Sequence, residues 1–227
     1  MKILTKLINQ NFLREKIENA FFSKKETAKA GLPLITFSRE MGAGGKPMAK
    51  LAVKKLGRQW QVYHEEIVDK IAEEAKLEKK LVSEIDENQA SAVDEFLADF
   101  FGRRYLSLSA YHQHLTKILT TIAKKGSAII IGRGAEYLFP EALKIRVICE
   151  MEQRINWEME FEKISRKEAV KRISESDKTR DKFIEELYGH NERKPHHYDL
   201  VIKTGPDLSI ETAANLIVHL AKKRFKI

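Results

Sequence analysis

The chain has 227 residues, of which 41 are Lys or Arg and 33 are Asp or Glu, so its formal net charge is +8. A chain of this length can bury one substantial core, and a single domain is the default expectation. The positive balance suits polyanionic ligands, whether nucleotides or nucleic acid. Because the charges are scattered through helical segments and form no basic tail, mononucleotides fit at least as well as nucleic acid.

The sequence has one cysteine, Cys149, which excludes an intrachain disulfide and fits a reducing compartment. It stands in an apolar run, so we expect a small buried residue and not a nucleophile. No uncharged stretch approaches the roughly 20 residues that span a bilayer. Charged residues interrupt the first thirty residues and disfavour a signal peptide. We therefore expect a cytoplasmic protein with no membrane partner.

Residues 1–30 place apolar side chains at helical spacing with mixed faces. We expect a helical extension that packs on the main domain, residues 31–227, or on a second subunit. The second case would give a homodimer. Binding of this segment to a membrane surface is disfavoured by its acidic residues.

A strand, a set of glycines and a helix follow one another between residues 34 and 56. Residues 34–37 read as a short buried strand, and the apolar spacing after Lys46 predicts an amphipathic helix that stops at Gly57. Gly42, Gly44 and Gly45 allow the connecting backbone to curl with its N–H groups facing inward. Unpaired N–H groups at a helix start bind anions, and a lysine at the rim adds a mobile positive charge. The segment therefore predicts a phosphate-binding loop.

The loop departs from the usual G-x-x-x-x-G-K-[ST] pattern, whose hydroxyl holds magnesium. Aligning Lys46 with the motif lysine puts Glu40 at the first glycine and Pro47 at the hydroxyl. Aligning the glycines instead puts Gly45 at the lysine position. In both alignments the magnesium hydroxyl is missing, and an ordinary glycine-rich turn is the alternative interpretation.

Further along the chain, strand-like apolar runs alternate with helical ones. Strands are expected at 60–63, 127–131, 143–149 and 199–203, and helices at 65–75, 78–88, 105–125, 152–161, 166–188 and 210–224. The pair Ser165 and Glu168 has the spacing of a capping box that starts one of these helices. The alternation predicts a parallel sheet covered by helices on both faces, with ligands at the carboxyl ends of its strands.

Two further groups of residues are expected to place positive charge at the carboxyl ends of the strands. Arg133 follows three isoleucines and lies between two glycines, where its guanidinium could hold a phosphate in a bidentate fork. The alternative is an ion pair at a strand end. The helix 166–188 is rich in Lys and Arg, and Asp177 and Arg180 share one of its faces. It could cover a migrating phosphoryl group, or it could be an ordinary solvated helix.

These features, in this order, resemble the cytidylate kinase-like family of P-loop nucleoside monophosphate kinases. The resemblance covers about residues 33–222, and four segments carry it: ITFSREMGAGG at 35–45, IIGRGA at 130–135, DKTR at 177–180 and YDLVI at 198–202. The Ser-Arg-Glu start with a double glycine is fairly specific to this branch. True cytidylate kinases, in contrast, have an intact lysine-plus-hydroxyl loop.

The resemblance implies a three-layer α/β P-loop kinase fold, with a parallel sheet of about five strands and a helical lid at about residues 152–189. It implies transfer of a phosphoryl group from ATP, with Mg²⁺, to CMP, dCMP or a similar acceptor, and no nucleic-acid partner. The donor-binding residues would be Arg39, Gly42, Ala43, Gly44, Gly45 and Lys46, the catalytic residues Lys46, Arg154, Asp177 and Arg180, and the acceptor-binding residue Arg133. Metal ligands are not assigned. His64 stands where relatives often have an aspartate, so the resemblance implies different contacts with the acceptor at this position.

Two rival functions stay open at this point. One is a small-molecule kinase of the same fold with another acceptor. The other is a catalytically weak nucleotide-binding or regulatory module, in which the loop binds phosphate without transferring it.

Overall fold

The computed structural model describes residues 32–64 and 108–227 of the chain. The strands are β1 (Leu34–Arg39), β2 (Gln61–Tyr63), β3 (Ala128–Ile131), β4 (Leu143–Cys149) and β5 (Leu200–Thr204). The helices are α2 (Gly45–Leu56), α5 (Leu108–Lys125), α6 (Ala135–Leu138), α7 (Met151–Glu162), α8 (Arg166–Tyr188) and α9 (Ile210–Phe225), with a 3₁₀ turn at Pro195–His197. The helices expected at 65–75 and 78–88, and the extension 1–30, lie outside the described residues.

The five strands form one sheet in the order β2-β3-β1-β4-β5, and every neighbouring pair is parallel. The predicted parallel sheet is therefore confirmed. Strand β1 lies in the centre, between β3 and β4. The loop that follows β1 consequently opens at the middle of the carboxyl edge, the edge at which ligands bind in sheets of this kind.

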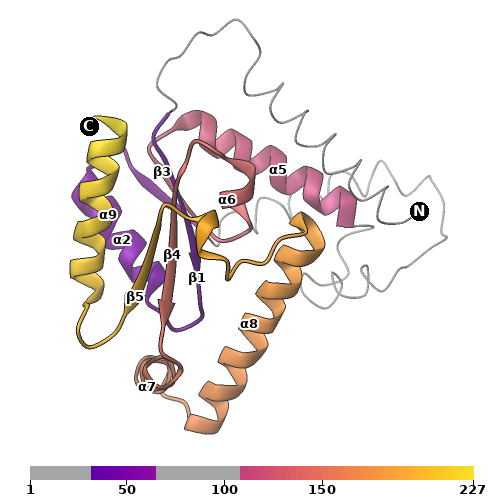
Figure 1. The fold of residues 1–227 in the computed structure, drawn as a ribbon, viewed down its shortest axis with the longest axis vertical. Coiled ribbons are helices and arrows are strands. Elements are labelled where there is room, and N and C mark those ends of the chain that lie inside the picture. The colour runs from indigo at the N-terminus through magenta and orange to yellow at the C-terminus, as the bar shows by residue number, and fades with distance from the viewer. Residues whose placement is uncertain (1–31, 65–107) are drawn as a thin grey trace, which may run out of the picture.

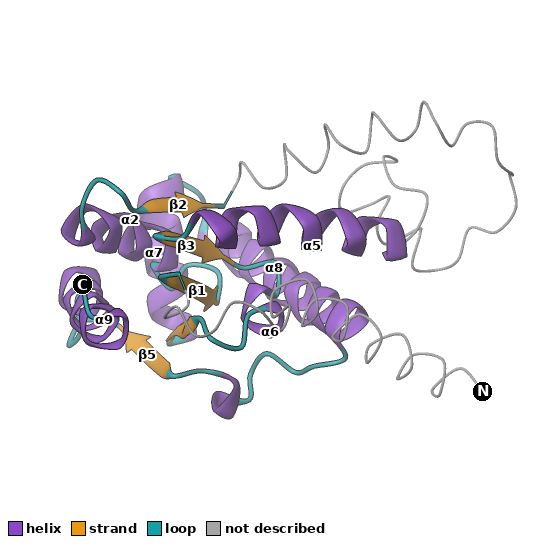
Figure 2. Cartoon of the chain, turned by 90° about the horizontal axis from the view of Figure 1, so that it is seen from above, coloured by secondary structure: helices purple, strands orange, loops and turns teal. Residues whose placement is uncertain are grey.

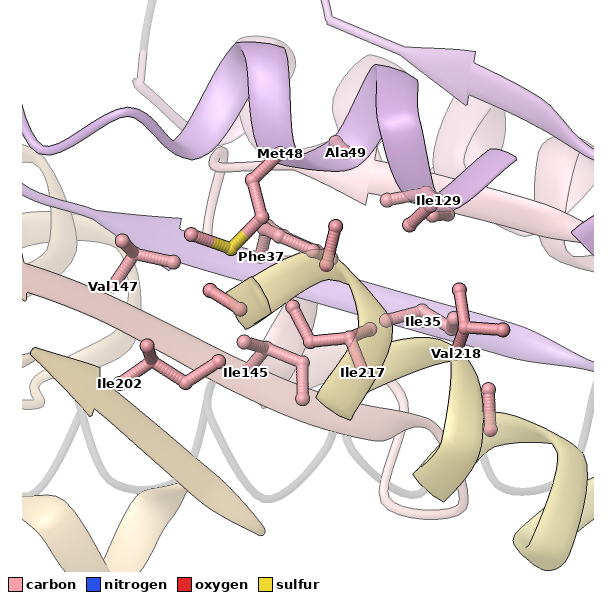
Figure 3. Close-up of a cluster of buried hydrophobic side chains, with 14 of the residues drawn as sticks. Ile35, Phe37, Met48, Ala49, Ile129, Ile145, Val147, Ile202, Ile217 and Val218 are labelled. Carbon is pink, nitrogen blue, oxygen red and sulfur yellow. The ribbon is translucent and has the colours of Figure 1, made fainter. Parts of the chain in front are cut away.

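Helices cover both faces of the sheet, so the predicted three layers are confirmed (Figures 1 and 2). On one face, α2 and α9 enclose a cluster that contains Ile35 and Phe37 of β1 together with Met48 and Ile217 (Figure 3). On the other face, residues of α5, α6 and the end of α8 pack against β1 and β3. Alternate residues of the central strands point to opposite faces, and both faces are apolar, which explains the continuous apolar runs.

Two local predictions are confirmed. The hydroxyl of Ser165 accepts a hydrogen bond of 3.2 Å from the backbone N–H of Glu168, as expected for the cap of α8. Cys149 is a buried free cysteine. No helix among the described residues is long and apolar enough to cross a membrane. The short helix α6 and the 3₁₀ turn were not predicted, because four residues or fewer are too short to show a periodicity.

The two halves of α8 are packed very differently. In the second half, Phe183, Ile184, Leu187 and Tyr188 are buried in the core against α5 and β3. In the first half the buried apolar contacts are those of Ala169 and Ile173, which form a small cluster with Ile155 of α7. Figure 1 shows α7 and the start of α8 beyond the end of β4, at the edge of the molecule. The predicted lid is thus anchored on the core at its carboxyl end.

Candidate active site

Three positions in the turn between β1 and α2 favour glycine over residues with a side chain. Gly42 and Gly44 have φ of 75° and 79°, in the left-handed region that favours glycine. A Cβ at Gly44 would lie 2.7 Å from Cδ1 of Ile210, and one at Gly45 would lie 3.0 Å from Cβ of Arg39. Helix α2 then starts with no side-chain cap and no acidic residue in its first turn. Its free amide groups and helix dipole fit an anion such as a phosphate.

The same turn, which we call the phosphate loop (residues 40–46), is held by contacts from three other elements. Thr204 at the end of β5 donates a hydrogen bond of 3.0 Å from Oγ1 to the carbonyl oxygen of Ala43. Arg154 of α7 donates from Nε to the carbonyl oxygen of Met41 at 2.6 Å, and the N–H of Met41 donates to Oδ1 of Asp177 at 3.2 Å. Two of these contacts come from α7 and α8, so the geometry of the loop depends on the position of these helices.

Arg154, Asp177 and Arg180 lie together beside the phosphate loop. The side chain of Arg154 is 4% exposed and forms ion pairs with Asp177 and, at 3.6 Å, with Glu40. Arg180 lies 3.6 Å from Asp177 on the same face of α8. The structure thus brings three of the four residues that sequence reasoning took as catalytic into one network, in which the Asp177 carboxylate lies between two guanidinium groups.

A cavity of about 510 Å³ opens next to this network. Four arginines line it, namely Arg39, Arg133, Arg172 and Arg180, and they come from β1, the turn after β3, and α8. Its volume is in the range of small-molecule sites. Several guanidinium groups around one cavity are suited to a phosphorylated ligand, because each can hold phosphate oxygens in a bidentate fork.

Arg133 is presented to the cavity by a strained turn. Its φ is 63°, in a region that residues with side chains rarely adopt, and it lies between Gly132 and Gly134, which have φ of 73° and 67°. The hydroxyl of Tyr188 donates to the carbonyl oxygen of Arg133 at 2.8 Å. A Cβ at Gly132 would collide with the guanidinium of Arg39, and one at Gly134 with the ring of Tyr188. Strain of this kind gathers at functional sites.

Arg39 lies in this cavity, whereas sequence reasoning grouped it with the residues that bind the ATP phosphates. Its Nη2 lies 2.9 Å from Nε2 of His64. Burial, followed by the positive charges of Arg180 and Arg133, lowers the pKa of Arg39 to about 9. The guanidinium is still charged at neutral pH.

Behind the cavity lies a buried polar network that sequence reasoning missed. Nη1 of Arg146 lies 3.1 Å from Oε2 of Glu192, and Ser38 donates a hydrogen bond of 3.2 Å from its hydroxyl to the same oxygen. Tyr198 donates from its hydroxyl to the carbonyl oxygen of Glu192 at 2.8 Å. An arginine inside the apolar strand 143–149 was the available signal, since a charge in a buried strand needs a buried partner.

Glu136 was also missed, and no sequence pattern singles it out. It lines the cavity at 3% exposure. Burial raises its pKa to about 7, although a hydrogen bond from its own backbone acts in the opposite direction. Among the described residues, its Oε2 has no hydrogen-bond partner.

The phosphate loop lacks the hydroxyl that holds magnesium in the usual pattern. Lys46 lies in the first turn of α2, and Pro47 follows it where a hydroxyl would be expected. The carboxylates of Glu40, in the loop, and of Asp177, beside it, are both paired with Arg154. Within residues 32–64 and 108–227 no cluster of three or more His, Cys, Asp or Glu could hold a metal ion. We therefore assign no metal ligand.

The all-parallel sheet, its strand order and the glycine loop before α2 define a P-loop kinase fold. The profile of the Cytidylate kinase-like family matches residues 34–206, so the chain belongs to this family. The resemblance noted from the sequence is thereby confirmed. No curated protein matches the chain significantly.

Solved structures show the same fold. An uncharacterized protein from Eubacterium ventriosum ATCC 27560 is 20% identical, with a TM-score of 0.60 over 84% of this chain and 98% of that one. TT1252 from Thermus thermophilus is 17% identical, with a TM-score of 0.50 over 85% and 98% of the two chains. Shikimate kinase from Acinetobacter baumannii, in complex with shikimate, matches at 12% identity with a TM-score of 0.44, over 86% and 95%.

Proposed function

We propose that the protein is a nucleoside monophosphate kinase that transfers the γ-phosphoryl group of ATP to CMP or dCMP. One observation carries the proposal. A cavity lined by four arginines lies directly beside an anion-binding loop, and Arg180 connects the two because it lines the cavity and pairs with Asp177, which binds the loop. Two adjoining anion sites are what a transfer between two phosphorylated molecules requires.

In this proposal the phosphate loop and the cavity hold different partners. The amide groups around Gly44 and the ammonium of Lys46 hold the ATP phosphates, while Arg133 and Arg39 hold the phosphate of the acceptor. An oxygen of the acceptor phosphate forms a bond to the γ-phosphorus as the bond to the β-phosphate oxygen breaks, giving ADP and a nucleoside diphosphate. Arg154 and Arg180 stabilise the negative charge on the transferred group. Magnesium bound to the ATP phosphates would neutralise further charge during transfer.

A small-molecule kinase of the same fold with another acceptor is the nearest alternative. A catalytically weak nucleotide-binding module is the second, and two observations favour it. Pro47 stands where a magnesium hydroxyl is expected, and the Asp177 carboxylate accepts a hydrogen bond from Met41, one of the loop amides. A carboxylate bound there is a competitor for a phosphate.

A coupled assay of ADP formation separates these functions. ATP is supplied with a panel of nucleoside monophosphates and with sugar phosphates, each with and without magnesium. We expect turnover with CMP or dCMP that depends on magnesium. Turnover with a different acceptor alone would show the first alternative. ATP binding without turnover for any acceptor would show the second.

A further inference from the structure

The cavity beside the phosphate loop is lined by both arginines and carboxyl groups. Arg133 and the α8 residues Arg172 and Arg180 supply positive charge, and the carboxyl groups are those of Glu136 of α6, Glu175 of α8 and Glu192 after α8. A ligand that fills the cavity is expected to carry both an anionic group for the arginines and an uncharged polar group for the carboxyls.

The two buried carboxyl groups of this cavity, Glu136 and Glu192, differ in their hydrogen bonding. Glu192 is satisfied by Arg146 and by Ser38. Glu136 has one oxygen within reach of its own backbone N–H, and its Oε2 has no hydrogen-bond partner among the described residues. A buried polar atom without a partner costs about 1–3 kcal/mol, and such atoms are rare in folded proteins. An incoming ligand with a hydrogen-bond donor would remove that cost.

Resting on the proposed function, we propose that Oε2 of Glu136 accepts a hydrogen bond from an amino group on the base of the acceptor. In nucleotides this selects cytosine over uracil. Cytosine presents an N–H donor at the ring position where uracil, like thymine, presents a carbonyl oxygen. An ionised carboxylate accepts from the donor and repels the carbonyl, and a site that hydrogen-bonds one substrate rejects the analogue that cannot form the bond.

The test compares CMP with UMP on the full chain at pH 8, where Glu136 is mostly ionised because its pKa is about 7. We expect wild-type kcat/KM to favour CMP by about 10- to 100-fold, the value of a hydrogen bond to a charged group. Glu136→Gln should reduce this preference about tenfold or more, through the KM of the acceptor, because an amide can also donate to a carbonyl. The exposed Glu141, five residues further along the chain, supplies the matched control Glu141→Gln, which should leave the preference unchanged.

Binding of CMP and UMP, measured by calorimetry on the same variants, separates failure of this inference from failure of the proposed function. A preference for CMP that depends on Glu136 in binding, without any turnover, supports the role of Glu136 and overturns the kinase. Turnover with the same CMP-to-UMP ratio in wild type and Glu136→Gln overturns the role of Glu136 and leaves the kinase intact. Failure of the wild type to bind either nucleotide overturns both. If Glu136→Gln does not fold, Glu136→Asp withdraws the carboxyl by one methylene and should lose the preference in the same way.

Discussion

The phosphate loop and the arginine-lined cavity adjoin each other but are built on opposite principles. The backbone of the loop is held by hydrogen bonds from Thr204 and Arg154 and to Asp177. The cavity instead gathers like charges, which add to the effect of burial in lowering the pKa of Arg39. Defined backbone geometry suits a loop that must match phosphate oxygens, whereas crowded positive charge becomes favourable when an anion binds.

The first prediction concerns the cavity and has the largest expected effect. Arg133→Ala should raise the KM for the monophosphate acceptor by about 100-fold, since a charge-assisted contact contributes about 1.5–3 kcal/mol and a bidentate one lies at the upper end. ATP affinity should stay nearly unchanged, because the loop binds it separately. Steady-state kinetics with each substrate varied in turn measures both values.

Arg133→Lys is the control for this change. A point charge lacks the bidentate fork, so the lysine variant should recover only part of the loss. If Arg133→Ala instead lowers thermal stability and keeps the wild-type KM for the acceptor, Arg133 serves a structural ion pair.

The second prediction concerns the lysine of the phosphate loop. Lys46→Ala should weaken ATP binding about ten- to hundredfold, the value of a charge-assisted phosphate contact. Lys50→Ala is the matched control, since Lys50 is exposed one turn further along α2. Calorimetric titration with ATP measures both variants. Equal affinities would show that Lys46 is no phosphate ligand, and Arg39 would then be the next candidate cation.

A third prediction concerns Glu136, one of the carboxyl groups that line the cavity. The pKa of Glu136 is raised from 4.5 to about 7 by burial, so the folded state binds its proton more tightly than the unfolded state does. This residue therefore contributes stability that is complete below about pH 4.5 and is lost as pH rises through about 7. Glu136→Gln should remove that decline. As pH rises from 5 to 8, the unfolding free energy of the variant should increase relative to that of wild type by about 1–3 kcal/mol.

Urea unfolding of wild type and Glu136→Gln at pH 5, 6, 7 and 8 measures this difference. Comparing the two proteins cancels the contribution of His112, whose pKa is lowered to about 4 by burial and which acts in the opposite direction. A difference in unfolding free energy that does not change with pH would mean that Glu136 is ionised throughout, with a partner.

The smallest expected effect concerns motion of α7 and the first half of α8, which reach across both parts of the site. These residues make few buried apolar contacts, so they should open at low free-energy cost in the free protein. Amide exchange should be fast at 151–180 and slow at 183–188. Adding ATP and CMP together should slow exchange several-fold at 151–180 alone. Equal protection with and without nucleotides would indicate a rigid helical pair and make Asp177 and Arg180 a structural ion pair.

The layered fold could be predicted from the sequence because strands buried on both faces leave continuous apolar runs, as at 143–149, and because helices leave amphipathic spacing and caps. Local chemistry also marked the phosphate loop and Arg133, since glycines beside a charged residue are visible in the chain. The start of α8 followed from the cap at Ser165.

The rest of the site depends on contacts between residues far apart in the chain. Ser38 and Glu192 are separated by 154 positions, and no spacing rule connects them. In the sequence, Glu136 is one acidic residue among many. Only its burial in the cavity, which the structure shows, identifies it as a candidate binding residue. Arg39 is the last residue of β1, directly before the phosphate loop, and sequence reasoning grouped it with the loop. Its side chain, however, turns toward His64 and the cavity.

The most direct test of the two-part site is a titration with a bisubstrate mimic, adenosine joined to cytidine through a chain of five phosphates. One molecule should bind per chain, displace ATP and CMP together, and bind more tightly than either nucleotide alone. Arg133→Ala and Lys46→Ala should each weaken it. A mimic that displaces ATP but leaves CMP bound, or that is indifferent to Arg133, would contradict the account, because the loop and the cavity would then not be two halves of one site.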